Sequence, residues 1–247
     1  MKSITVQRSD HGSIYAYGSA AFHAQGVGFG DPALTDQLDL LPATHAATME
    51  RFQESRVGEE LREQMWRPVV TIAAHNAFNT ALAEKRDAAR AGAEHENPAR
   101  PISDAFAGEV WSTFRSADKA GQARLIQEAD LSDLTALRHL GNRVPLDPVL
   151  WDEVTRRYRI ENRLVASGIA AQFPAVPTLD HPLAIGADMD AARAQVEEWE
   201  KRHAERLEAV AQNERTAQRL VHFLAAVFEV QPAEVLAAMS GQTREAA

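Results

Sequence analysis

Residues 188–228 read DMDAARAQVEEWEKRHAERLEAVAQNERTAQRLVHFLAAVF, and this segment contains neither proline nor glycine. A helix over the whole segment would be about 60 Å long at 1.5 Å per residue, which exceeds the width of a small domain. Apolar residues recur in it at alternating spacings of three and four, the pattern of a helix face that packs against another helix. We call the strongest of these positions the helix seam: Met189, Val196, Trp199, Val210, Leu220, Leu224 and Val227.

The helix seam predicts a long amphipathic helix that packs as a coiled coil against a second copy of the chain or a partner helix. Its middle is weaker than its ends, because His203, Arg206 and Asn213 occupy the repeat positions there. The segment EVQP then favours a turn, followed by a short helix at 232–239 that folds back as an αα-hairpin and closes the long helix. This short helix has no arginine or lysine, which argues against recognition of DNA.

The composition favours a mainly α fold. Alanine accounts for 45 of the 247 residues, and it has the highest helix propensity while adding little to the core of a sheet. We therefore expect a multi-helix bundle, in which a first helix begins with Asp31 as its cap and ends before Pro42. Helical periodicity continues over 43–91, with an interruption at 55–58 and a junction at Pro68. Further helices are expected at 103–115, 118–129, 132–140 and 147–172.

The first 30 residues predict a small β-hairpin and a flexible glycine-rich arm. Apolar and polar residues alternate over 3–17 around the segment SDHG, whose composition suits a turn. Three glycines at alternate positions between 26 and 30 then favour flexibility over 20–30. A phosphate-binding loop is not expected there, because the segment has no lysine and Asp31 would place a carboxylate beside the phosphate.

Stretches rich in proline and glycine divide the chain into three expected parts. These are the hairpin and arm at 1–30, a helical core at 31–179, and the long helix with its closing hairpin at 180–247. GAEHENPARP at 92–101 predicts a linker inside the helical core, and FPAVPTLDHPLAIGA at 173–187 predicts a second linker before the long helix.

Charge and residue types exclude several functional classes. The formal net charge of −9 argues against general nucleic-acid binding, and the absence of cysteine excludes disulfides, thiol nucleophiles and cysteine-ligated metals. The nine histidines show no metal-ligand spacing and no pattern indicates a catalytic triad, so we expect no metal and no cofactor, and we favour a non-enzyme. The longest apolar runs are too short for a membrane span and the N-terminus lacks a secretory signal, which favours a cytoplasmic protein or a virion component.

A basic cluster gives one alternative. Arg156, Arg159 and Arg163 share a helix face in the segment RRYRIENR and form a candidate contact for nucleic-acid phosphates. Acidic residues four positions away, such as Glu153 and Glu161 around Arg157, match much of the local charge.

The sequence as a whole favours a non-enzymatic helical protein for protein–protein interaction or assembly, structural or accessory in a phage-like particle, that self-associates through the helix seam. A nucleic-acid-associated accessory protein that uses the three arginines is the alternative, and an enzyme with an unrecognised site comes third. No membrane partner is expected.

Overall fold

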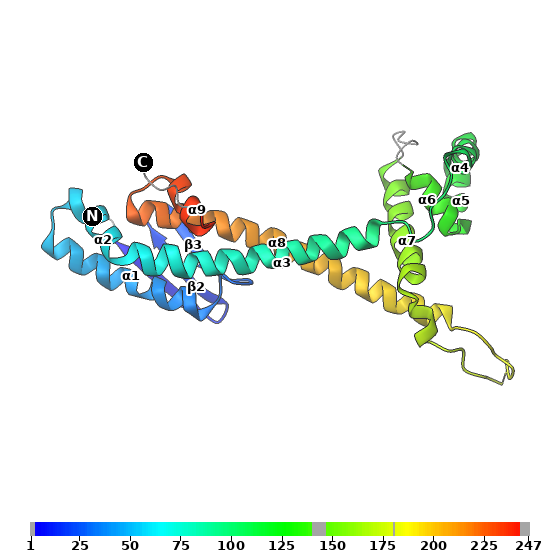
Figure 1. The fold of residues 1–247 in the computed structure, drawn as a ribbon, viewed down its shortest axis with the longest axis horizontal. Helices are drawn as coiled ribbons and strands as arrows, with labels where there is room; N and C mark the ends of the chain where they lie inside the picture. Colours follow the sequence, from blue (N-terminus) through cyan, green and yellow to red (C-terminus); the bar gives the residue numbers. More distant parts are fainter. Residues whose placement is uncertain (1–2, 140–146, 180, 243–247) are drawn as a thin grey trace. The chain divides into compact units, whose positions relative to one another are not determined.

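In the computed structural model of the chain, residues 3–139, 147–179 and 181–242 are described, without the side chain of His95. Helices dominate, a small antiparallel sheet lies at the N-terminus, and a long helix near the C-terminus is followed by a short one (Figure 1). The mainly α fold expected from the composition is therefore confirmed.

The chain divides into two compact units, and each is described by itself. The terminal unit comprises Met1–Ala89 and Glu205–Ala247, and the central unit is Arg90–Ala204. Two long helices, α3 (His75–Glu96) and α8 (Met189–Phe228), each contribute one end to each unit. This division differs from the parts expected at 1–30, 31–179 and 180–247, because both unit boundaries lie inside helices rather than in the proline-rich loops.

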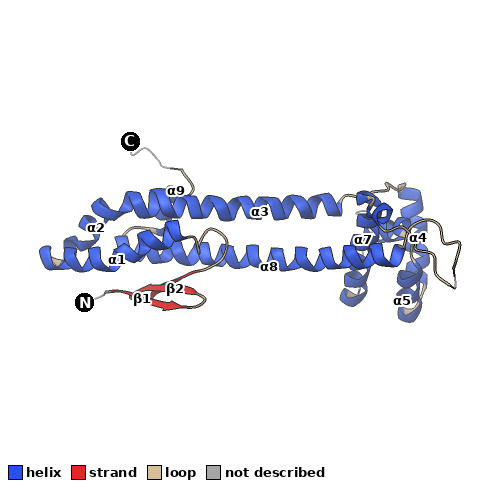
Figure 2. Cartoon of the chain, turned by 90° about the horizontal axis from the view of Figure 1, so that it is seen from below, coloured by secondary structure: helices blue, strands red, loops and turns tan. Residues whose placement is uncertain are grey.

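The sheet of the terminal unit has three strands, β1 (Ile4–Ser9), β2 (Gly12–Tyr17) and β3 (Ala20–Ala24), in the order β1-β2-β3. The β1–β2 hairpin is the one predicted from the sequence. The third strand corrects the expectation of a flexible arm over 20–30, because it pairs with β2 along its whole length and buries Phe22. The strands, red in Figure 2, lie against the helices of this unit.

The glycines after β3 allow the chain to pass close to two helices. Gly26 and Gly28 have φ angles of 84° and 81°, which residues with a side chain rarely adopt. A Cβ atom at Gly26 would lie 2.1 Å from Oδ1 of the buried Asn213, and one at Gly28 would lie 2.5 Å from the carbonyl oxygen of Ala77. The glycine-rich segment is therefore a tightly packed turn.

Two prolines are accommodated differently from the sequence expectation. Helix α1 (Pro32–Arg51) continues through Pro42, because its buried face extends from Leu34 past the proline to Thr48. Asp31 caps this helix as predicted, accepting a hydrogen bond from the backbone N–H of Ala33 at 2.7 Å. After a break, α2 (Val57–Trp66) leads into a π-helical segment at Arg67–Ala74, with Pro68 in its first turn.

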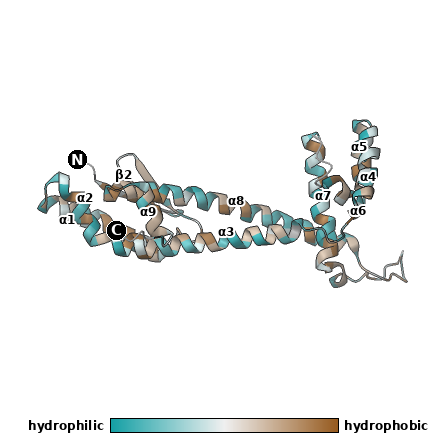
Figure 3. Cartoon of the chain, turned by 45° about the horizontal axis from the view of Figure 1, so that its top comes forward, coloured by the Kyte–Doolittle hydropathy of each residue, from teal (hydrophilic) through white to brown (hydrophobic). Residues whose placement is uncertain are grey.

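The core of the terminal unit joins the sheet to α8. The rings of Tyr15, Phe22 and Phe223 form a cluster with centroid separations of 6.3, 6.3 and 6.5 Å. Helix α9 (Pro232–Met239) closes this core with Val235 and Met239, as the predicted αα-hairpin requires. Figure 3 shows hydrophobic and hydrophilic residues alternating along α3 and α8, as expected of helices with one buried face.

The central unit contains four capped helices and the first part of α8. Ser103, Asp118, Asp130 and Asp147 each accept a hydrogen bond from the first turn of the helix that follows. The helices are α4 (Asp104–Ser116), α5 (Lys119–Glu128), α6 (Leu131–Arg138) and α7 (Pro148–Ser167), followed by a 3-10 turn at Ile169–Gln172. Their bounds agree closely with the sequence expectation, except that residue 140, the expected end of the third helix, lies outside the described residues. Gly168, with a φ of 62°, ends α7 before the expected residue 172.

Helix α7 packs against two separate apolar clusters. Leu150, Val154 and Tyr158 near its start belong to the cluster with α4, α5 and α6. Ile160 and Leu164 near its end pack with Ala192 and Val196 of α8. The first part of α7 therefore packs against α4, α5 and α6, and its later part packs against α8.

The burial of His45 predicts that the stability of the terminal unit depends on pH. This residue of α1 is buried at 3% exposure, its Nε2 has no hydrogen-bond partner within the described residues, and its ring lies 5.4 Å from that of Tyr17. Burial lowers the pKa of His45, and the charge of Glu229 opposes this shift. Because the unfolded chain takes up the proton more readily, the free energy of unfolding should decrease as the pH falls below about 6.5.

We expect His45→Phe to reduce this loss between pH 7.5 and 5.5, measured by urea unfolding at each pH. His222→Gln changes an exposed histidine of α8 in the same unit and serves as the control. An unchanged loss in His45→Phe would assign the pH dependence to another group.

Candidate functional site

The helix seam is largely covered within the chain itself. Val210, Leu220, Leu224 and Val227 are buried in the terminal unit, where the last three belong to the core that joins α8 to the sheet and α9. Val196 is buried in the central unit against α7. In this fold these five side chains are buried within the chain itself.

The remaining two seam positions have different surroundings. The Trp199 ring is in contact with two side chains: the Cζ atom of Arg163 lies 3.3 Å from the ring centroid, and the ring of His203 stacks on it at 4.9 Å. Met189 is exposed at the start of α8. The seven predicted residues are thus divided between the two units and form no single surface within either.

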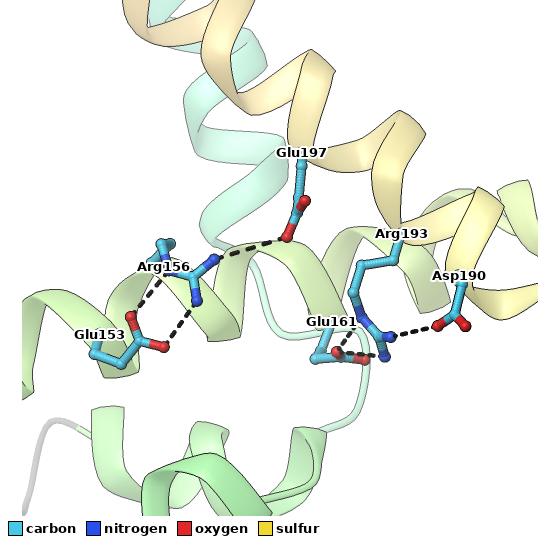
Figure 4. Close-up of polar contacts among 6 residues, drawn as sticks. All are labelled: Glu153, Arg156, Glu161, Asp190, Arg193 and Glu197. Carbon is cyan, nitrogen blue, oxygen red and sulfur yellow. Dashed lines mark hydrogen bonds and ion pairs between the residues drawn. The ribbon is translucent and has the colours of Figure 1, made fainter. Parts of the chain in front are cut away.

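The three arginines of the basic cluster are all engaged by side chains of the central unit. Arg156 forms ion pairs with Glu153 at 2.8 Å and Glu197 at 3.7 Å (Figure 4). Arg159 pairs with Glu96 at 2.9 Å, and Arg163 lies on Trp199. The hydrogen bond to Glu153 raises the pKa of Arg156, whereas burial lowers the pKa of Arg163.

Carboxylates also outnumber guanidinium groups in the hollow beside these arginines. The hollow has a volume of about 450 Å³ and is lined by Asp152, Glu197 and Glu200 as well as Arg156 and Arg159. A nucleic-acid phosphate would have to displace the carboxylates or lie beside them, and both are unfavourable. The geometry therefore gives little support to phosphate binding at this face.

A further ion-pair group joins the end of α7 to the start of α8. Arg193 contacts Glu161 at 3.1 Å and Asp190 at 3.4 Å (Figure 4). Partly exposed pairs of this kind contribute about 0–1 kcal/mol each, so their main effect is to fix the geometry. These ion pairs join α7 to the start of α8, where the chain that connects the two helices ends.

That intervening chain forms an exposed loop whose two ends are tied together. Pro174 and Ala187 form an antiparallel bridge, and the backbone N–H of Ala175 donates to the carbonyl oxygen of Gly186 at 2.9 Å. The N–H of Asp188 donates to the carbonyl oxygen of Phe173 at 2.7 Å, and Phe173 packs on the cluster at the end of α7. We call residues 173–179 and 181–189 the apolar arm; it is drawn in yellow in Figure 1.

The apolar arm exposes large hydrophobic side chains. Val176, Leu179, Leu183 and Ile185 are 73%, 102%, 88% and 93% exposed, and Met189 of the helix seam lies at the arm's end. Scattered exposed hydrophobic residues are ordinary, but several in one short segment are typical of an interaction surface. In the sequence this stretch predicted only a linker, although its aliphatic residues fit no helical or strand pattern that would bury them.

A second apolar surface lies in the same unit. Helices α4, α5 and α6 form a groove of about 260 Å³, which we call the α4–α6 groove. It is lined by Phe106, Glu109, Val110, Thr113, Phe114, Leu125, Ala129, Asp133 and Leu137. Phe106 is partly exposed at 36%, so the groove can be reached from solvent.

The described part of the chain contains no group of three or more histidine, aspartate or glutamate side chains placed to hold a metal ion. Within it, no single helix is long and apolar enough to cross a membrane, and α8 with α9 passes such a test only as a pair bent by 118°. Comparison with models of protein families, with curated proteins and with solved structures gives no match. The candidate site is therefore inferred from the exposed surfaces of this structure alone.

Proposed function

We propose that this protein is a non-enzymatic helical assembly protein whose copies associate through the apolar arm. The observation that supports this function best is the exposure of four large aliphatic side chains on one short loop with tied ends. Such a protein would serve as a structural or accessory component of a larger assembly, in the cytoplasm or in a phage-like particle.

Hydrophobic burial would supply the driving force. Removing a valine, leucine or isoleucine side chain from water contributes about 1.5–3 kcal/mol, and the arm exposes four of them. The bridge at Pro174 and Ala187 restricts the arm before binding, which lowers the entropy that association must remove. The proposed contact between copies therefore lies at the exposed apolar arm, and not at the helix seam, most of which is buried within the chain.

The arm predicts an association that depends on protein concentration. We expect light scattering after size-exclusion chromatography, at physiological salt, to detect a species larger than the 27.1 kDa chain as the concentration rises. The double variant Leu183→Ser/Ile185→Ser should remain a monomer, because it removes two of the four exposed side chains.

A matched control changes one exposed leucine and one exposed isoleucine in the terminal unit. The double variant Leu40→Ser/Ile72→Ser, at positions 51% and 49% exposed, should associate like the original chain. A monomer for the unmodified chain up to several hundred micromolar, or equal loss of association in both double variants, would contradict the proposed function.

A further inference from the structure

We infer that the apolar arm of one copy occupies the α4–α6 groove of a second copy. This inference rests on the proposed function and adds the receptor for the arm. The central unit thus supplies both halves of the contact, an exposed aliphatic segment and an exposed apolar groove.

The size of the groove fits side chains of the arm. An apolar cavity of about 150 Å³ is enough to hold a benzene molecule. The α4–α6 groove, at about 260 Å³, therefore has room for a four-carbon side chain such as that of Leu183 or Ile185 and for part of another.

The chemistry of the two surfaces is also complementary. Phe106, Val110, Leu125 and Leu137 present aromatic and aliphatic carbon to the groove. Glu109 and Asp133 line it too, and when ionised their carboxylates can accept hydrogen bonds but cannot donate them. The arm's exposed His181 provides an N–H donor for one of these carboxylates, and the aliphatic side chains on either side of it provide the apolar contact.

The arm and the groove of one copy lie at different ends of the central unit. The groove is built on α4, α5 and α6, which pack with the start of α7, whereas the base of the arm packs at its end. In Figure 1 the arm extends away from α4 and α5. The groove of each copy is therefore open to the arm of another copy, and a repeated contact of this kind builds a ring or a chain.

The expected contact is small. A standard interface uses roughly 20–30 residues on each side, and smaller ones form weak, reversible complexes. The arm is shorter than this, so we expect association in the micromolar range, and the experiments need protein at tens to hundreds of micromolar.

Cysteine cross-linking tests the pairing directly, because the chain has no cysteine of its own. One variant carries Ile185→Cys in the arm and a second carries Val110→Cys in the groove. When the two are mixed and oxidised, we expect a disulfide between different copies in at least several-fold excess over the control pair, Ile185→Cys with Val165→Cys. Val165 is an exposed residue of α7 outside the groove. Mass spectrometry of the digested dimer should identify the joined peptides.

Two further variants keep the outcome decisive. Phe106→Cys replaces Val110→Cys if that variant fails to fold, and Phe106→Glu should abolish association while circular dichroism shows the helices intact. Association that is lost in Leu183→Ser/Ile185→Ser but gives no excess of the arm–groove disulfide would overturn the groove as receptor and leave the proposed function standing. Absence of any association would overturn both.

Discussion

Replacing Leu224 with alanine is expected to lower the free energy of unfolding by about 2–5 kcal/mol at every protein concentration. Leu224 is fully buried in the core of the terminal unit, together with Leu220 and Phe223 of the same helix. Truncation would remove apolar contacts and leave a cavity between α8 and the elements packed on it. Chemical unfolding followed by circular dichroism at 2 and 100 micromolar, as rough limits, would measure the effect.

The same experiment distinguishes a helix seam that is buried in the core of one chain from a helix seam that forms an interface between copies. If Leu224 lay in an interface between copies, Leu224→Ala would reduce stability only where the oligomer forms, so its effect would grow with concentration. Leu207→Ala on an exposed face of α8 is the control and should change the unfolding free energy by less than about 0.5 kcal/mol. If the loss of unfolding free energy in Leu224→Ala grew with protein concentration, the helix seam would be the interface between copies that the sequence predicted.

Periodicity locates the long helix well but does not identify what covers it. The expected segment 188–228 differs from α8 by one residue, and the closing helix at 232–239 agrees with α9. The repeat of apolar residues requires a buried face, and that requirement is the same whether the partner is another chain or a distant part of this one. Here Phe223 packs on Tyr15 and Phe22, about 200 residues earlier in the chain, a separation that no local pattern encodes.

The third strand and the continuous α1 depend on tertiary contacts in a similar way. The sequence AAFHA at 20–24 has a low intrinsic preference for a strand, and it forms one because β2 offers an edge and Phe22 fills the aromatic cluster. Pro42 removes a helical hydrogen bond, yet the buried face on both of its sides keeps α1 helical. In both places packing outweighs local propensity.

The candidate site could be predicted only in part. Helical spacing predicted that Glu153 matches the charge of Arg157, but in the structure Glu153 pairs with Arg156 instead. The contact of Arg159 with Glu96 joins residues far apart in the sequence. The aliphatic residues of the apolar arm are visible in the sequence, but their exposure is a property of the fold, because any of them could have filled a core. The groove is formed by three helices, so no single segment could reveal it.

Asn162→Ala is expected to destabilise the central unit by about 2–4 kcal/mol, because it removes two partly buried hydrogen bonds from a buried side chain to the backbone. The side chain of Asn162 is fully buried on α7. Its Oδ1 accepts from the N–H of Ala99 at 2.7 Å, and its Nδ2 donates to the carbonyl oxygen of Asn97 at 2.8 Å. The variant would leave these backbone groups without their partners just after the end of α3, which costs more than the loss of an exposed bond.

Hydrogen exchange of individual segments would locate this effect. Faster exchange in α4, α6 and α7, with the strands and α1 unchanged, is expected if the two compact units open separately. Asn162→Asp retains an acceptor for Ala99 but cannot donate to Asn97, so it should also destabilise the unit, with the added cost of a buried charge. The control is Arg159→Gln, a change on the same helix as Asn162 that removes a half-exposed ion pair with Glu96 of α3. It should lower the free energy of unfolding by less than about 1 kcal/mol. Uniform acceleration throughout the chain in Asn162→Ala would instead mean that α3 and α8, which run through both units, couple them into one cooperative structure.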